Sequence, residues 1–148
     1  MPMDANTQGN VYGGSILRLV DEIAGVVAAR HARCNVVTAS LDRMDFLSPV
    51  YLGNLLILKA SVNYVGHTSM EVGVKIETED LRTGQRLHTG TAYLTFVALD
   101  GNGKPKPIPK VIPETALEKE RFREGKLRRE QRLEDLERRR LKRVRKQA

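Results

Sequence analysis

The sequence predicts an α+β fold in which one long apolar helix packs on a face of an antiparallel sheet. Residues 14–30 form a run rich in Ala, Ile, Leu and Val, and its apolar side chains recur at helical spacing. Four segments with the composition of strands follow between residues 35 and 99, joined by short turns. Short turns favour antiparallel neighbours, so the helix is expected to cover one face of the sheet.

The helix of residues 14–30 would be roughly 25 Å long. Large apolar residues recur along it, and small residues flank them: Ile16, Leu19, Val20, Ile23, Val26 and Val27, with Ala24, Gly25, Ala28 and Ala29. Because little polar surface remains, we expect most of this helix to be buried. Asp21 lies in its middle, one turn after Arg18, and a buried carboxylate is costly unless it is paired or used. Asp21 is therefore either the partner of Arg18 or a functional residue.

A glycine-rich loop, residues 6–14, leads into the helix. Gly13 and Gly14 open the helix, where unpaired N–H groups favour an anion or a developing oxyanion. The loop matches neither the phosphate-binding P-loop nor the dinucleotide fingerprint.

The expected strands are residues 35–46, 53–65, 68–79 and 87–99. The third alternates with period two, which is typical of a strand with one face buried and one in water. Its apolar residues fall on one side and its polar residues on the other: Met70, Val72, Val74 and Ile76 against Ser69, Glu71, Lys75 and Glu77.

The C-terminal part differs in composition from the rest. Residues 103–113 are rich in proline and predict an extended linker or a strap over the surface. Residues 114–148 hold 14 Lys and Arg against 8 Asp and Glu, so most of the net charge of +7 lies there. We expect one globular domain over residues 1–113 and a basic helical tail over 114–148. The tail is interpreted as a solvated charged helix, with an acidic partner, RNA or nucleotide phosphates as alternatives; no nucleic-acid motif supports RNA.

Composition restricts the cellular setting. The 148 residues suit a single globular body, and neither a secretory signal nor a run of about eighteen apolar residues is visible. A single cysteine, Cys34, favours a reducing compartment, so we expect a cytoplasmic protein. The three histidines are scattered, and we expect no metal site.

Several motifs occur together in the order found in one enzyme family. They are DAN-x-x-G-N-V-Y-G-G at residues 4–14, LVDEIAGVVAARHA at 19–32, VVTASLDRMDFLSPV at 36–50 and VGHTSMEV at 65–72. Residues 2–113 thereby resemble the hotdog-fold acyl-CoA thioesterases of the acyl-CoA hydrolase family. Family members usually have a strand ahead of the first motif, and we expect the fold to form without it. The basic tail is longer and more charged than in the family.

The resemblance implies a central helix wrapped by an antiparallel sheet of four to five strands, in a dimer often assembled into trimers of dimers. It implies hydrolysis of acyl-CoA to free fatty acid and CoA without a metal or prosthetic group. Asp21 matches the family's catalytic acid, as general base or nucleophile. Asn6 matches an asparagine that orients water or thioester across the dimer interface. The N–H of Gly14, supported by Gly13, would polarise the thioester carbonyl.

For the CoA end of the substrate, one turn matches the family's G-x-T-S motif: Gly66, His67, Thr68 and Ser69. Its hydroxyls and N–H groups are expected to hold pantetheine or phosphate oxygens, with Thr38 as a further candidate. Relatives commonly carry Arg at the position of His67, which is largely uncharged near neutral pH. A plain hairpin turn at Gly66 and a turn-forming role for Asn6 are the structural alternatives.

Two other functions fit the same fold. A non-catalytic acyl-CoA-binding module with a partner-binding basic tail would keep the pocket but would not need Asp21. A hotdog dehydratase or isomerase would pair a histidine with a carboxylate, and no histidine lies in the loop or the early helix. We therefore place the dehydratase or isomerase last.

Overall fold

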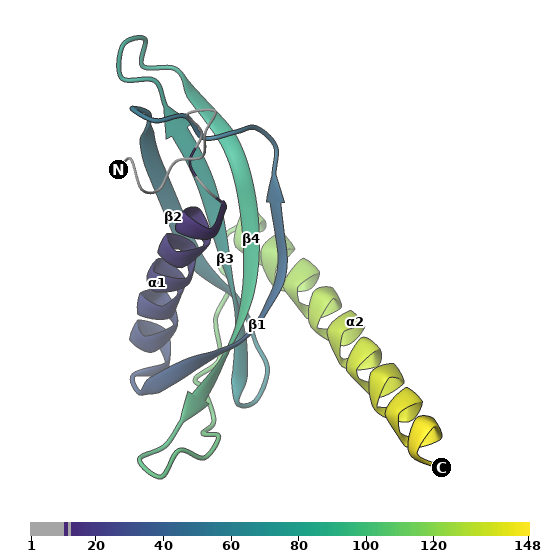
Figure 1. Cartoon of the computed structure of the whole chain (residues 1–148). Coiled ribbons are helices and arrows are strands. Elements are labelled where there is room, and N and C mark those ends of the chain that lie inside the picture. The colour runs from purple at the N-terminus through teal and green to yellow at the C-terminus, as the bar shows by residue number, and fades with distance from the viewer. Residues whose placement is uncertain (1–10, 12) are drawn as a thin grey trace.

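The computed structural model describes residues 11 and 13–148 (Figure 1). Helix α1 (Gly13–Ala32) is followed by four strands and a second helix: β1 (Asn35–Phe46), β2 (Leu55–Val65), β3 (Ser69–Glu79), β4 (Arg86–Leu99) and α2 (Ala116–Gln147). The strands form an antiparallel sheet in the order β1-β4-β3-β2. Helix α1 lies along one face, and α2 crosses the other (Figure 1). The predicted α+β architecture is confirmed.

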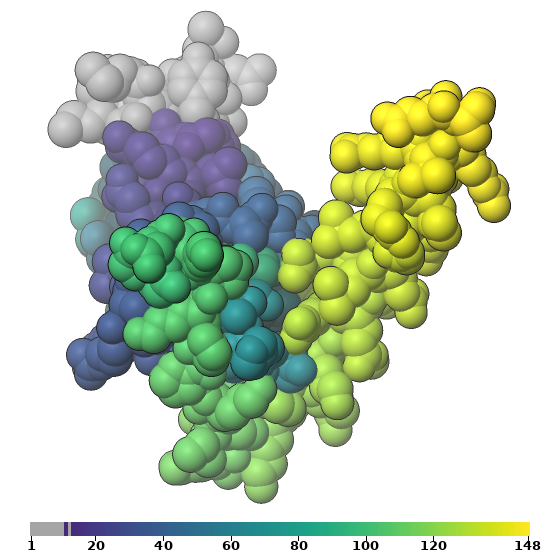
Figure 2. All heavy atoms as spheres, turned by 90° about the horizontal axis from the view of Figure 1, so that it is seen from below, coloured from purple at the N-terminus to yellow at the C-terminus, as the bar shows by residue number. Residues whose placement is uncertain are grey.

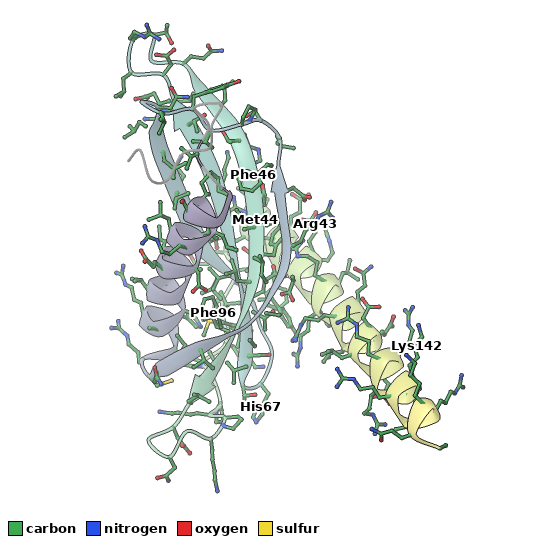
Figure 3. The ribbon with its side chains drawn as sticks, in the orientation of Figure 1. Arg43, Met44, Phe46, His67, Phe96 and Lys142 are labelled. Atoms are coloured by element: carbon green, nitrogen blue, oxygen red, sulfur yellow. The ribbon has the colours of Figure 1, made fainter. Side chains whose placement is uncertain are left out.

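Helix α1 buries one stripe and not most of its surface. Residues four positions apart face the sheet and are at most 7% exposed: Ile16, Val20, Ala24, Ala28 and Ala32. The prediction that most of the helix is buried is wrong for the single chain, since Val26 is 67% exposed. Alanines belong to the buried stripe because helix and sheet lie close together. A Cβ placed on Gly25, for example, would lie 3.8 Å from the ring of Phe96 (Figure 3).

Strand β3 shows the predicted alternation on the face toward α1. Its apolar side chains there are at most 1% exposed: Met70, Val72, Val74 and Ile76. The sequence predicts that the opposite face of β3 is exposed to water. Glu71 on that face is only 6% exposed, because α2 crosses the sheet over it.

The first half of α2 is docked on the sheet. Gly125 is buried there, and a Cβ on it would lie 3.1 Å from Oε1 of Glu71 and from Cβ of Tyr64. The rings of Phe122 and Tyr64 pack edge to face with their centroids 5.0 Å apart. The interpretation of the tail as a solvated helix is therefore wrong for this half. From residue 133 onward α2 is exposed and projects away from the sheet (Figure 1).

An ion pair reinforces this docking. The Nε and Nη2 atoms of Arg128 donate hydrogen bonds of 2.9 and 2.7 Å to the carboxylate of Glu71. The same guanidinium stacks 3.7 Å from the ring centroid of Tyr93. Burial lowers the pKa of Arg128, but the hydrogen bonds and charge of Glu71 outweigh it, so this pKa lies above its ordinary value.

Residues 104–113 form the predicted strap. The N–H of Lys106 donates to the carbonyl of Ala98 at 2.8 Å, and the N–H of Ile108 donates to the carbonyl of His67 at 2.9 Å. Ile108 is buried at 5% exposure and anchors the strap to the core. Neither helix in the described part of the chain combines the length and hydropathy needed to cross a bilayer.

Candidate active site

Asp21 lies midway along α1 on the helix's exposed side. The hydroxyl of Thr38, on β1, donates a hydrogen bond of 2.7 Å to Oδ1 of Asp21. Among the described residues the carboxylate pairs with Thr38 and not with Arg18, so the alternative of an Arg18 partner is wrong. Its second oxygen, Oδ2, accepts no hydrogen bond from the described residues.

A β-bulge in β1 aims Thr38 at α1. Thr38 lies opposite Phe96 and Ser40 lies opposite Thr95, so Ala39 is the extra residue. Residues paired directly across two strands point to the same face of the sheet. Phe96, the partner of Thr38, is a core residue beneath α1 (Figure 3). Thr38 therefore shares the α1 face, where it meets the carboxylate one layer above the sheet.

The first turn of α1 contains no acidic residue. N–H groups at the start of a helix and the positive end of its dipole favour an anion or oxyanion. Among the described residues, no atom outside the helix backbone lies within 4 Å of a Cβ placed on Gly14. A Cβ placed on Gly13 would be 3.8 Å from the ring of Phe46. Packing against the described residues does not demand glycine at either position.

A groove of about 400 Å³ borders this helix end. It runs between α1 and the segment that joins β1 to β2, and its lining is mainly apolar: Val11, Gly13, Ile16, Phe46, Leu47, Ser48, Pro49 and Val50. An apolar groove beside oxyanion donors has the character of an acyl-chain site. Asn6, the predicted partner of Asp21, lies outside the described residues.

The turn from Gly66 to Ser69 lies at the other end of the sheet. Ser69 is level with Val97 and hence with the start of β1, whereas Gly13 lies beside Phe46 at the end of β1. About 25 Å of strand separates these two levels. His67 and Phe46 lie well apart along the sheet in Figure 3. Within one chain, therefore, the structure brings Asp21 and Thr38 together but does not bring the turn to the N-terminus of α1.

The turn itself is firmly held. The N–H of Gly66 donates to the carbonyl of Ser69 at 2.9 Å, and the carbonyl of Thr68 accepts from the N–H of Ala98 at 3.0 Å. His67 is exposed, and Thr68 and Ser69 are half-buried. The predicted CoA contacts thus lie on a hydrogen-bonded hairpin tip at which His67 is exposed and Gly66 is buried.

Two large hollows among the described residues lie away from Asp21. One, of about 570 Å³, lies between the end of α1, β2 and the strap, and another, of about 610 Å³, lies on the outer sheet face beside α2. Asp21 and Gly14 line neither hollow. A substrate pocket at Asp21 therefore needs walls from outside the described residues. Among the described residues, no group of three or more His, Cys, Asp or Glu side chains is arranged to hold a metal ion.

Comparison with known proteins identifies the family. Residues 8–85 match the profile of the Thioesterase superfamily. An uncharacterized acyl-CoA thioester hydrolase of Bacillus subtilis is 48% identical over 117 residues, which cover 79% of this chain and 68% of that protein. The chain belongs to the thioesterase superfamily. The predicted resemblance to the hotdog acyl-CoA thioesterases is thereby confirmed.

Solved structures of other thioesterase-superfamily members share the fold. An apo-hexameric acyl-CoA thioesterase has a TM-score of 0.88 at 43% identity, with 92% of this chain and 87% of that chain covered. An acyl-CoA hydrolase of Staphylococcus aureus in complex with coenzyme A has a TM-score of 0.90 at 39% identity, with 100% and 89% covered. That hydrolase has been solved with one asparagine, one threonine or one aspartate replaced by alanine.

Proposed function

We propose that this chain hydrolyses acyl-CoA thioesters to a free fatty acid and CoA, with Asp21 as its catalytic carboxylate. The observation that carries the proposal is the pairing of Asp21 with Thr38 on the exposed side of α1. A carboxylate oriented by one neighbour, with its second oxygen available, suits a general base or a nucleophile. CoA enters as part of the substrate, and neither route calls for a prosthetic group.

The spacing of three polar residues supports the assignment. In the Staphylococcus aureus hydrolase, the residues replaced by alanine are an asparagine, an aspartate 15 positions later, and a threonine 17 positions after the aspartate. Asn6, Asp21 and Thr38 are separated by the same 15 and 17 positions in this chain. We therefore assign Thr38 the role of orienting the catalytic carboxylate, and not the role of binding CoA.

The chemistry follows from these positions. As a base, Asp21 takes a proton from water through Oδ2 while the water oxygen bonds to the thioester carbon. The carbonyl oxygen becomes negative and is stabilised by N–H groups at the start of α1, that of Gly14 first. Collapse of the tetrahedral intermediate breaks the C–S bond, and the proton held by Asp21 passes to the departing thiolate. As a nucleophile, Asp21 would first form a mixed anhydride, which water then hydrolyses.

A second copy of the chain completes the site in this proposal. Hydrophobic side chains on α1 and β1 are exposed, with Val26 at 67%, Val37 at 43% and Leu41 at 40%. Within the described chain, β1 is an edge strand of the sheet. Antiparallel pairing of β1 with its copy would cover this edge and bring Asn6 of the partner toward Asp21. A trimer of such dimers would match the hexameric state named for one relative.

The test is release of thiol from acyl-CoAs of increasing chain length, from acetyl to palmitoyl, by the wild type and by Asp21→Ala and Asn6→Ala. We expect turnover that falls by at least about a hundredfold in Asp21→Ala, because a general base or nucleophile commonly contributes 10²–10⁴-fold. Glu22→Ala, a change at the neighbouring exposed carboxylate, is the matched control and should keep wild-type turnover.

Thiol release by the wild type that does not exceed the Asp21→Ala background would refute the enzyme assignment. Binding of CoA esters that survives Asp21→Ala in that case would identify the acyl-CoA-binding module instead. Activity that remains in Asp21→Ala but is lost in Glu22→Ala would move the catalytic role to the neighbouring residue.

A further inference from the structure

The distal part of α2, residues 133–147, stands clear of the sheet; we call it the arm. Every residue of the arm is exposed, and its yellow end is separated from the body of the molecule in Figure 2. Lys142, which lies on the arm, is far from the sheet in Figure 3. The arm begins directly after Arg132, whose Nε lies 3.9 Å from Oδ1 of Asp42 on β1. The base of the arm is thus tied to the sheet, while the rest of it is open to the surroundings.

One side of the arm is apolar. Four aliphatic side chains that are 46–56% exposed fall within an arc of about 140° around the helix axis: Leu133, Leu136, Leu141 and Val144. The same arc contains Glu137 and Arg140, which neutralise each other. Nη2 and Nε of Arg140 donate hydrogen bonds of 2.8 and 3.2 Å to the carboxylate of Glu137. This arc therefore carries no net charge.

The other side of the arm is cationic. Seven of the last eleven residues of the chain are Lys or Arg, and none of the eleven is Asp or Glu. Arg138 lies 3.7 Å from Asp135, and Arg140 is paired with Glu137. The other five cations have no carboxylate partner among the described residues, and they lie outside the apolar arc: Arg139, Lys142, Arg143, Arg145 and Lys146.

An apolar arc bordered by cations suits the surface of an anionic bilayer. A helix of this kind lies in the plane of the interface, with its apolar side toward the acyl chains and its Lys and Arg side chains at the headgroup phosphates. Each cation held near such a surface strengthens binding about fivefold. The apolar side chains add the second contribution that lasting attachment needs.

Nucleic acid and a second copy of the arm match these residues less well. Single strands are bound on aromatic side chains, and the arm contains no aromatic residue. Phosphate contacts along a duplex would use the cations but would leave the apolar arc in water. Contact between the apolar arcs of two arms would bring their cationic flanks together, and like charges repel.

We propose that the arm binds the surface of a bilayer rich in anionic lipid. Its four aliphatic side chains enter the boundary between headgroups and acyl chains. Arg143 and Arg145, which border the apolar arc on either side, contact the lipid phosphates. The ion pair of Arg128 with Glu71 fixes the docked half of α2, so the sheet is held beside the membrane. This inference goes beyond the proposed function and does not depend on it, since it concerns where the protein binds and not what it hydrolyses.

Co-sedimentation of the full chain with lipid vesicles tests the cations. We expect the wild type to bind vesicles of equal parts phosphatidylglycerol and phosphatidylcholine at least about tenfold more tightly than vesicles of phosphatidylcholine alone. Arg143→Gln/Arg145→Gln should lower the affinity for the anionic vesicles about tenfold or more. Lys104→Gln/Lys106→Gln removes two exposed lysines from the strap, and this control of equal net charge should bind nearly as the wild type does.

The apolar arc is tested separately. Leu141→Gln/Val144→Gln should also lower the affinity for anionic vesicles about tenfold or more, because two aliphatic side chains no longer leave water. Its control is Leu81→Gln/Ile112→Gln, which changes side chains that are 65% and 77% exposed outside the arm. All of these positions are exposed, so melting temperatures should stay within about 2 °C of wild type. Thiol release from butyryl-CoA without vesicles should also match the wild type.

Three results would overturn the proposal. The first is an affinity for anionic vesicles that either arm variant leaves at the wild-type value. The second is the absence of vesicle binding by the wild type, together with an affinity for single-stranded RNA that Arg143→Gln/Arg145→Gln abolishes, which would assign the cations to nucleic acid. The third is a smaller oligomer of Leu141→Gln/Val144→Gln in native mass spectrometry with unchanged vesicle binding, which would show that a second copy covers the apolar arc.

Discussion

Thr38 is the neighbour that orients the carboxylate of Asp21. Its hydroxyl lies 2.7 Å from Oδ1, and both residues are exposed in the single chain. Because the pair is exposed, it contributes little to the free energy of unfolding; its importance lies in the direction in which Oδ2 points. A strand residue thus acts on the chemistry through a helix residue.

Replacement of Thr38 by valine should therefore lower the activity and leave the stability nearly unchanged. Valine has the shape of threonine but donates no hydrogen bond, and a bond to a charged group is worth roughly 1.5–3 kcal/mol. We expect kcat for butyryl-CoA to fall about tenfold to a hundredfold. The melting temperature should stay within about 2 °C of wild type, since an exposed substitution changes stability little. Thr38→Ser restores the donor and should restore most of the rate; a serine variant as slow as the valine variant would contradict this role.

At the scale of single residues, the sequence predicts Asp21 but not its partner. A carboxylate in an apolar helical run is conspicuous in the sequence, and it matches a family motif. The contact with Thr38 depends on the bulge at Ala39, which decides the face to which each residue of β1 points. A one-residue irregularity of this kind leaves no signal in composition or periodicity. The contacts that Lys110 and Arg129 make with Gly66 escape prediction for a similar reason, since these two residues lie 44 and 63 positions further along the chain.

At the scale of elements, helix α2 is held by one buried ion pair. Glu71 is 6% exposed at its side chain and Arg128 is 23% exposed. Asn63 also donates to Glu71 at 3.0 Å, so the carboxylate is satisfied from both sides. The raised pKa of Arg128 means that its contribution to folding is complete below the ordinary arginine pKa and is lost only as the pH rises through the raised value. The arginine half of this pair thus adds no pH dependence near neutrality.

Substitution of Glu71 by glutamine tests the docking of α2. The amide still accepts from Asn63 but no longer neutralises Arg128, and we expect the free energy of unfolding to fall by about 2–3 kcal/mol. The matched control is Glu137→Gln, whose partner Arg140 is 68% exposed, and that change should leave the free energy of unfolding nearly unchanged. Both values come from urea denaturation. Equal values for the two variants would show that α2 is not anchored through Glu71.

A helix or strand could be predicted from the sequence where the pattern that specifies it lies within its own residues. The strands and α1 follow from periodicity and turn residues, and their observed bounds agree closely with the expected ones. Helix α2 was predictable as a helix, but its docking was not. Its contacts are a glycine, an aromatic ring and arginines, namely Gly125, Phe122 and Arg128, which do not form the apolar stripe that predicts burial.

At the scale of the whole molecule, the single chain holds half of the proposed site. Asp21 and Thr38 lie on an open surface, and the β2–β3 turn lies about 25 Å along the sheet from the level of the N-terminus of α1. A protein that keeps a catalytic carboxylate, exposed apolar residues and a free strand edge on one side is expected to pair through that side. The proposal that Asn6 and Asp21 come from different protomers makes this pairing testable by complementation.

Mixing two inactive variants should restore activity. A heterodimer of Asn6→Ala and Asp21→Ala has two sites, and one of them contains both altered residues. The other contains the intact Asp21 of the Asn6→Ala protomer and the intact Asn6 of the Asp21→Ala protomer. With random exchange at equal concentrations, half of the dimers are mixed and each has one complete site, so we expect about a quarter of wild-type activity. Native mass spectrometry follows the exchange of subunits and thiol release follows activity.

The control for complementation is Asp21→Ala mixed with the double variant Asn6→Ala/Asp21→Ala. That mixture contains no intact Asp21, and it should stay at background although its subunits exchange equally well. Recovery in the first mixture alone would place Asn6 and Asp21 on opposite protomers of one site. If mixed dimers form and neither mixture gains activity, both residues act within one chain, and the open surface around Asp21 must be closed by contacts other than the loop of a second copy.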